Sequence, residues 1–141
     1  MTQLNDTSKV DREPPAPVSY TRAYWEATKQ RKLLLQYDPR AKKYQFYHRP
    51  VSIYDGLGDL ELREAVGTGE IFSYTVAVRA RPPFQGHEPF AMAVVTLKEG
   101  VNIMANMVNC TKEDLRIGLP VKLTWLQMKN GANLPAFEPA K

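Results

Sequence analysis

The sequence contains a single cysteine, Cys110, and only two histidines, His48 and His87, among its 141 residues. One cysteine excludes an internal disulfide and leaves no set of thiolates for a metal cluster. Long hydrophobic runs are also missing: the longest apolar stretches have the length of strands, which excludes a membrane-spanning helix. The N-terminal residues lack the apolar core of a secretory signal. We therefore expect a cytoplasmic protein.

The motifs of stand-alone enzymes are missing as well. The sequence has no HExxH, GxSxG, P-loop or Rossmann fingerprint. Nucleophilic catalysis needs a base beside the nucleophile, and Cys110 has no activating neighbour in the sequence. We predict that the chain carries no catalytic residue of its own, while membership of a larger acyl-transfer complex stays open.

The charge is modestly positive, with 19 Lys and Arg against 15 Asp and Glu, a formal net charge of +4. This excess suits an acidic partner or a phosphate-bearing ligand. It falls short of the dense basic patch of a dedicated nucleic-acid binder. The length is sufficient for one compact domain, or for a small domain plus an appendage.

The N-terminal part predicts a tail and a helix. Residues 1–18 are polar and then rich in proline, and we predict that they form a disordered tail. Ser19 is placed to cap a helix over residues 20–31, in which Tyr20, Tyr24 and Ala27 share one face.

Residues 33–54 predict a small hairpin. The apolar stretch 33–37 indicates a strand, and residues 44–54 indicate a second strand with a turn at Pro50. Together with the preceding helix this hairpin is predicted to form a module over residues 19–58.

The second half of the chain predicts a mainly β fold. Five strands are expected at 70–78, 90–97, 101–108, 121–128 and 134–137. The capping pattern of Thr111 and Asp114 predicts one helical turn between the third and fourth strands. This order predicts a five-stranded Greek-key barrel of the OB type over residues 59–141.

The first of these strands carries two further patterns. Its apolar side chains alternate with Ser73 and Thr75, which predicts one apolar face made of Phe72, Tyr74, Val76 and Val78. The glycine pair Gly67 and Gly69 at its start indicates a turn or a bend of the barrel.

The stretch QYDPRAKKYQFYHRPVSIYDG, residues 36–56, has the outline of a zinc ribbon without its ligands. A zinc ribbon carries Cys-x-x-Cys in each of two turns. Here the four positions are occupied by Asp38, Ala41, Ser52 and Asp55, so no zinc is expected. One alternative stays open, a harder or mixed-ligand metal held by Asp38, Asp55 and His48.

Aromatic packing is our hypothesis for what holds this hairpin in place of zinc. Burial of each large ring can contribute roughly 1.5–3 kcal/mol, against the helix, the barrel or a partner. The large apolar residues concerned are Leu33 to Leu35, Tyr37, Tyr44, Phe46, Tyr47 and Tyr54. We also interpret Asp38 and Asp55 as caps of their turns.

Two groups of residues are candidates for ligand or partner binding. On the helix and hairpin they are Trp25, Tyr47, Arg49 and Tyr54, with the alternative that Arg49 only shapes the turn. On a basic, proline-stiffened loop after the first barrel strand they are Arg79, Arg81, Phe84 and His87. Such a loop can anchor a protein interface, grip the phosphates and adenine of CoA, or simply be solvated.

Five segments carry a resemblance to a known family: YWEATKQRKLLLQ (24–36), FYHRPVSIYDG (46–56), GTGEIFSYTVAVRARPPF (67–84), EDLRIGLPVKLTW (113–125) and LPAFEP (134–139). In order and spacing they resemble the bacterial and archaeal acyl-CoA-associated OB-fold proteins with an N-terminal rubredoxin-like zinc ribbon, formerly a domain of unknown function. No single motif is very specific, but the series is. Aligning Arg49-Pro50 with the Arg-Pro of the family places all four zinc cysteines at non-cysteine positions.

The resemblance implies a helix, a metal-free ribbon and an OB barrel. It implies a non-catalytic accessory subunit, needed for assembly or activity, of a thiolase-like, aldolase or hydratase partner that acts on CoA thioesters. An acyltransferase complex that makes acylated phenols uses such a subunit too. Because some members are proposed to contact CoA, a CoA thioester at the complex stays open. The alternatives are a stand-alone CoA-thioester binding protein and, with less support, a single-stranded nucleic-acid binder.

Overall fold

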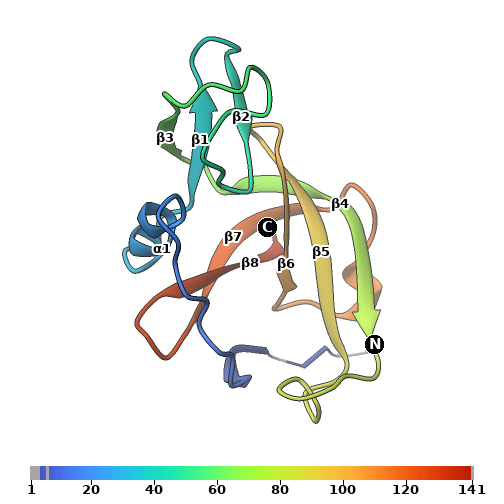
Figure 1. Ribbon diagram of the computed structural model, residues 1–141. Helices are drawn as coiled ribbons and strands as arrows, with labels where there is room; N and C mark the ends of the chain where they lie inside the picture. Colours follow the sequence, from blue (N-terminus) through green and yellow to red (C-terminus); the bar gives the residue numbers. More distant parts are fainter. Residues whose placement is uncertain (1–3, 6, 141) are drawn as a thin grey trace.

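The computed structural model describes residues 4, 5 and 7–140 (Figure 1). The chain forms a closed five-stranded barrel and a separate three-stranded sheet. The small sheet stands at one end of the barrel, and the short helix α1 (Arg22–Thr28) lies beside it (Figure 1). The predicted fold, mainly β with a five-stranded OB-type barrel, is confirmed. No helix in the described part of the chain is long and apolar enough to cross a membrane.

The barrel strands follow the predicted order and lie close to the predicted bounds. They are β4 (Thr68–Ala77), β5 (Phe90–Leu97), β6 (Asn102–Met107), β7 (Pro120–Gln127) and β8 (Asn133–Pro139). Around the barrel they are arranged β4-β5-β6-β8-β7, and β7 pairs again with β4. The single turn η2 (Lys112–Asp114) connects β6 to β7.

The barrel interior is filled by alternate side chains of the strands. Along β5, Ala91, Ala93, Val95 and Leu97 are buried, and Phe137 of β8 is fully enclosed. Across the β5–β6 pair, Ala91 lies opposite Met107 and Val95 opposite Ile103, and all four are buried.

Strand β4 differs from its sequence pattern. Phe72 and Val78 are 60% and 71% exposed, whereas Ile71, outside the predicted apolar face, is buried. A β-bulge between Ile71 and Ser73 shifts the pairing with β5, and a bulge interrupts the strict alternation of sides. The apolar pattern of β4 therefore supplies exposed surface as well as core.

The small sheet contains β1 (Leu34–Asp38), β2 (Lys43–Gln45) and β3 (Glu61–Glu64) in the order β2-β1-β3. The second strand ends at Gln45 instead of continuing through the predicted 44–54. The predicted OB-fold domain begins at residue 59, whereas β3 pairs with β1 of the small sheet. All four β3 side chains are exposed, so no apolar alternation marks it in the sequence.

The helix is shorter than the predicted 20–31. Ser19 does not cap it, since the helix follows Thr21. At the other end the Thr28 hydroxyl donates to the carbonyl of Trp25 at 2.6 Å, a contact that competes with helix continuation. Arg31 adopts a left-handed φ of 58°, which a continuing helix does not allow.

Residues 4, 5 and 7–12, within the predicted disordered tail of residues 1–18, pack on the barrel. Leu4 and Val10 are buried, flanking the turn η1 (Thr7–Lys9). The Arg12 guanidinium donates to Asn106 Oδ1 of β6 at 2.9 Å. Two apolar side chains and one arginine thus hold a segment whose composition is otherwise polar.

Gly69 explains the glycine pair at the start of β4. It pairs with Leu97 of β5 and Val121 of β7 at the same time. A Cβ on residue 69 would collide with the Thr96 carbonyl oxygen and lie 2.9 Å from Val95 Cγ1. The barrel bend therefore requires glycine at this position.

We predict that Gly69→Ala destabilises the barrel by about 1–3 kcal/mol or more, because the added methyl group has no space beside the β5 main chain. Gly58→Ala is the matched control: nothing lies within 4 Å of its added Cβ, and the expected change is within about 0.5 kcal/mol. Urea unfolding of the two variants measures the difference. Equal stabilities would contradict the close approach at Gly69.

Candidate functional site

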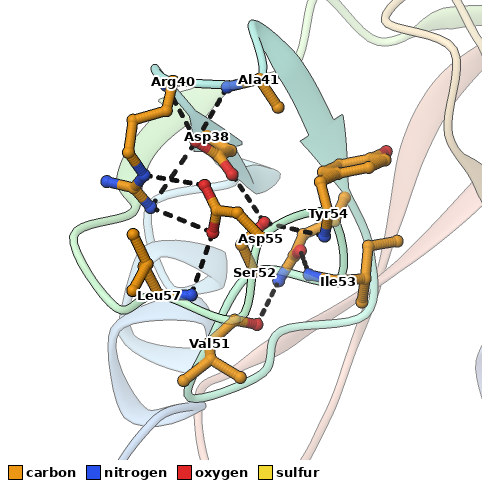
Figure 2. Close-up of polar contacts among 10 residues, drawn as sticks. Asp38, Arg40, Ala41, Val51, Ser52, Ile53, Tyr54, Asp55 and Leu57 are labelled. Carbon is orange, nitrogen blue, oxygen red and sulfur yellow. Dashed lines mark hydrogen bonds and ion pairs between the residues drawn. The ribbon is translucent and has the colours of Figure 1, made fainter.

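The four positions of the missing zinc cysteines still lie together in the structure (Figure 2). The Asp38 side chain is fully buried. Its Oδ2 accepts a hydrogen bond of 2.6 Å from Ser52 Oγ, and its Oδ1 accepts the amides of Arg40 and Ala41 at 2.8 and 3.1 Å. One carboxylate therefore joins the two turns that a zinc ion would join.

Asp55 completes this clamp, which we define as Asp38, Arg40, Ser52 and Asp55. Arg40 Nε lies 2.7 Å from Asp55 Oδ2, and the Leu57 amide donates to Asp55 Oδ1 at 2.9 Å (Figure 2). These two donors, Arg40 first, hold the pKa of Asp55 well below its usual value. Both carboxylates cap turns as predicted, and they also link the turns to each other.

A second layer of buried amides lies beneath the clamp. Gln36 Oε1 accepts from Gln45 Nε2 at 2.7 Å and from the Arg49 amide at 2.9 Å. Gln45 Oε1 accepts the Ile53 amide at 2.8 Å. The two glutamines fix the loop after β2 to the small sheet. Sequence reasoning missed them, because a glutamine within a short strand does not show whether it is buried.

The donor arrangement does not fit the metal alternative. Among residues 4, 5 and 7–140, no group of three or more His, Cys, Asp and Glu is placed to hold a metal. His48 points elsewhere: its Nε2 donates to the carbonyl of Leu34 at 2.7 Å. The oxygens of Asp38 already accept three N–H or O–H donors, so they are committed to hydrogen bonds.

Aromatic rings join the ribbon to α1. This agrees with the packing hypothesis for Phe46, one of the residues that it names. Tyr24 of α1 lies 5.6 Å from the Phe46 ring and 5.1 Å from the His48 ring. Burial raises the pKa of Tyr24 and lowers the pKa of His48. A neutral His48 is thus packed between a helix and a strand carbonyl.

These contacts border an apolar cleft of about 290 Å³. Its walls come from α1, from the loop after β2, and from β6 and β8 of the barrel. The cleft brings together the predicted residues Trp25 and Tyr47, with Met104 of β6 on the barrel side. Apolar surface dominates the lining, which suits an apolar side chain or chain segment.

The other predicted residues lie outside the cleft. Arg49 is held through its main chain, and its side chain is exposed. The Tyr54 hydroxyl donates to the Tyr44 carbonyl, and Lys43 lies over the Tyr54 ring. Tyr54 therefore serves the packing of the ribbon itself.

The basic loop is at the opposite end of the barrel from the small sheet (Figure 1). Phe84 stacks on Phe90 with ring centres 5.0 Å apart, and the Arg12 guanidinium lies over the Phe84 ring. Arg79 and Arg81 are exposed, and His87 is half-buried. The structure does not bring this loop to the cleft, and Phe84 has a packing role.

Replacing the central carboxylate tests the clamp. We predict that Asp38→Ala leaves two amides and one hydroxyl without an acceptor and destabilises the protein by about 1–3 kcal/mol or more. The amides of Arg40 and Ala41 should lose their protection against hydrogen exchange. Asp59→Ala, at an exposed aspartate of the loop between β2 and β3, is the control, and a similar effect there would contradict a special role for Asp38.

Acid should weaken the ribbon in two steps. The pKa values of His48 and Asp55 are lower in the folded protein than in the unfolded chain, so the unfolded chain binds more protons in acid and stability falls. The first loss of stability, from His48, begins as the pH falls below about 6.5. The second, from Asp55, begins below about 4. His48→Gln should remove the first step and Asp55→Asn the second in urea unfolding followed against pH. A flat profile between neutral and mildly acidic pH would contradict this account of His48.

Comparison with known proteins places the chain in a family. The ChsH2 C-terminal OB-fold domain matches residues 62–126. A probable enoyl-CoA hydratase alpha subunit of Thermomonospora curvata is 36% identical over 140 residues, 98% of this chain and 43% of that protein. A DUF35 domain-containing scaffold protein of Methanocaldococcus jannaschii is 32% identical over 63 residues, 45% of each chain. The chain thus spans less than half the length of these two curated relatives.

Solved structures agree. A chain of the Ltp2-ChsH2(DUF35) aldolase superimposes with a TM-score of 0.81 at 33% identity, covering 91% of this chain and 100% of that one. A DUF35 protein from Sulfolobus solfataricus shares the fold at 11% identity, with a TM-score of 0.64 over 86% of each chain. The chain belongs to the DUF35 family, with a ChsH2-type OB-fold barrel and with a hydrogen-bonded clamp at the four positions that a zinc ribbon fills with cysteines.

Proposed function

We propose that the chain is a non-catalytic accessory subunit of a thiolase-like or aldolase enzyme complex that acts on CoA thioesters. Its role is in assembly and in completing the substrate site of the larger subunit. The observation that carries the proposal is the similarity, over nine-tenths of the chain, to the DUF35 chain of an aldolase named for both Ltp2 and ChsH2.

The environments of Cys110 and His48 support a non-catalytic role for this chain. Cys110 is buried, and burial, with a smaller contribution from the charge of Asp114, raises the pKa of its thiol to about 11. A protonated, enclosed thiol is a poor nucleophile. His48 is buried, and its Nε2 donates to a strand carbonyl, which supports a packing role for this side chain.

Exposed apolar side chains support a partner surface. Tyr47 and Met104, which both line the cleft, are 51% and 59% exposed, and Phe72 on β4 is exposed to a similar degree. Aromatic residues and methionine are enriched at protein interfaces. Of the other predicted interface residues, Trp25 lines the same cleft, whereas Arg49 and Tyr54 stay in the proposal as candidates outside it.

Affinity purification of the tagged chain from its host at moderate salt tests the proposal. We expect a stoichiometric aldolase, thiolase-like or hydratase subunit, and a complex mass well above the 16.0 kDa of this chain. A chain that remains alone at 16 kDa would contradict the accessory role. Binding of CoA by such a lone chain, seen as thermal stabilisation, would favour the stand-alone CoA-binding alternative, and bound RNA or DNA the nucleic-acid alternative.

A further inference from the structure

The barrel is incompletely paired along one seam. β6 and β8 run parallel, and they pair only at Asn106 with Ala136 and at Met107 with Phe137. Toward the start of both strands the pairing stops, although β6 continues back to Asn102 and β8 to Asn133. The apolar cleft lies over this unpaired part of the seam.

Pro135 explains why the pairing stops. Extending the register back by two residues places Met104 opposite Leu134. In a parallel ladder the Met104 carbonyl would then accept the amide of residue 135, and proline has no amide hydrogen. The β6 edge at Met104 is therefore without its next strand neighbour.

On both β6 and β8, a side-chain oxygen accepts a main-chain amide that continued strand pairing would use. The Met104 amide donates to Tyr47 Oη at 2.9 Å. On β8, the Asn133 amide donates to Thr28 Oγ1 at 3.3 Å. The phenol of the ribbon loop thus occupies the position where the carbonyl of an adjacent strand would lie.

The groove at this edge is apolar and extends beyond the cleft. Met92 and Met104 line both the cleft and a second hollow of about 120 Å³, which Tyr74 of β4 borders. Methionine side chains adapt their shape to different apolar partners. The groove therefore offers adaptable apolar contacts on both sides of Met104.

We propose that an extended segment of the larger subunit docks in this groove as an added strand on β6. The occupant is identified by two features. The open main-chain edge at Met104 matches the regularly spaced amides and carbonyls of an extended polypeptide, and the lining selects apolar side chains on alternate residues. This inference rests on the proposed accessory function and adds the docking site and the type of partner segment.

Tyr47 acts in this proposal as a placeholder. It satisfies the Met104 amide while the groove is empty and gives way to a carbonyl of the incoming strand. The hydroxyl oxygen is fixed to the ring, so the exposed Tyr47 side chain has to turn away from β6 as the strand enters. Its contact with Phe46, 4.4 Å between ring centres, changes with that movement. The ribbon loop thereby protects an exposed strand edge, a feature that otherwise promotes aggregation.

Binding of the co-purifying subunit to variants of the full chain tests the docking site. Met104→Glu places a carboxylate in the apolar groove and should weaken binding at least tenfold. Val78→Glu, at an exposed apolar position just after the end of β4, should leave binding unchanged. Tyr47→Phe keeps the ring and removes the competing hydroxyl, so it should strengthen binding severalfold; a Tyr47→Phe variant that binds more weakly would overturn the placeholder role.

The outcomes separate this inference from the proposed function. If the complex forms and Met104→Glu binds as well as the natural chain, the accessory role stands and the groove is not the docking site. If Val78→Glu weakens binding as much as Met104→Glu, docking lies elsewhere and the inference is overturned. Circular dichroism of each variant confirms that it is folded, and Met104→Gln, a neutral side chain of similar length, replaces Met104→Glu if that variant does not fold. If no complex forms with the natural chain, the proposed function fails, and the docking site with it.

Discussion

The hydrogen bond from Ser52 to the buried carboxylate of Asp38 is the contact on which the rest of the ribbon depends. It ties the turn after β1 to the loop that follows β2. That loop carries Phe46, Tyr47 and His48 to α1 and to the barrel. The cleft, and the stand-in contact of Tyr47 with β6, exist only because the loop is held in this position.

A buried carboxylate is costly to desolvate, and it is stable here because each of its oxygens is satisfied. Hydrogen bonds to charged groups contribute about 1.5–3 kcal/mol each, whereas a structural zinc ion can contribute roughly 10 kcal/mol or more in isolated peptides. The clamp alone is therefore weaker than zinc. The buried glutamine pair and the rings around Tyr24 also stabilise the ribbon. Aromatic packing and the polar network together therefore replace the zinc ion.

The sequence predicts the barrel well because its strands bury one side, and this burial leaves an apolar alternation with turn residues between. The strand at Glu61–Glu64 has no buried side, so its pairing with β1 leaves no such pattern. The bulge in β4 interrupts the alternation, so that Phe72 is exposed and Ile71 is buried. A bulge depends on the partner strand rather than on local composition. Trp25 and Tyr47 were found as aromatic candidates, but the groove was not. Its cause, a proline at the next position of β8 from which the β6–β8 ladder needs an amide, becomes visible only when the register is known.

The structure of the purified complex tests the account most directly. We predict that a segment of the larger subunit lies along β6 beside Met104, with its main chain paired to that strand and the Tyr47 hydroxyl displaced from the Met104 amide. A complex in which this groove is open to solvent, with the partner seated on the basic loop around Arg79 and Arg81, would contradict it.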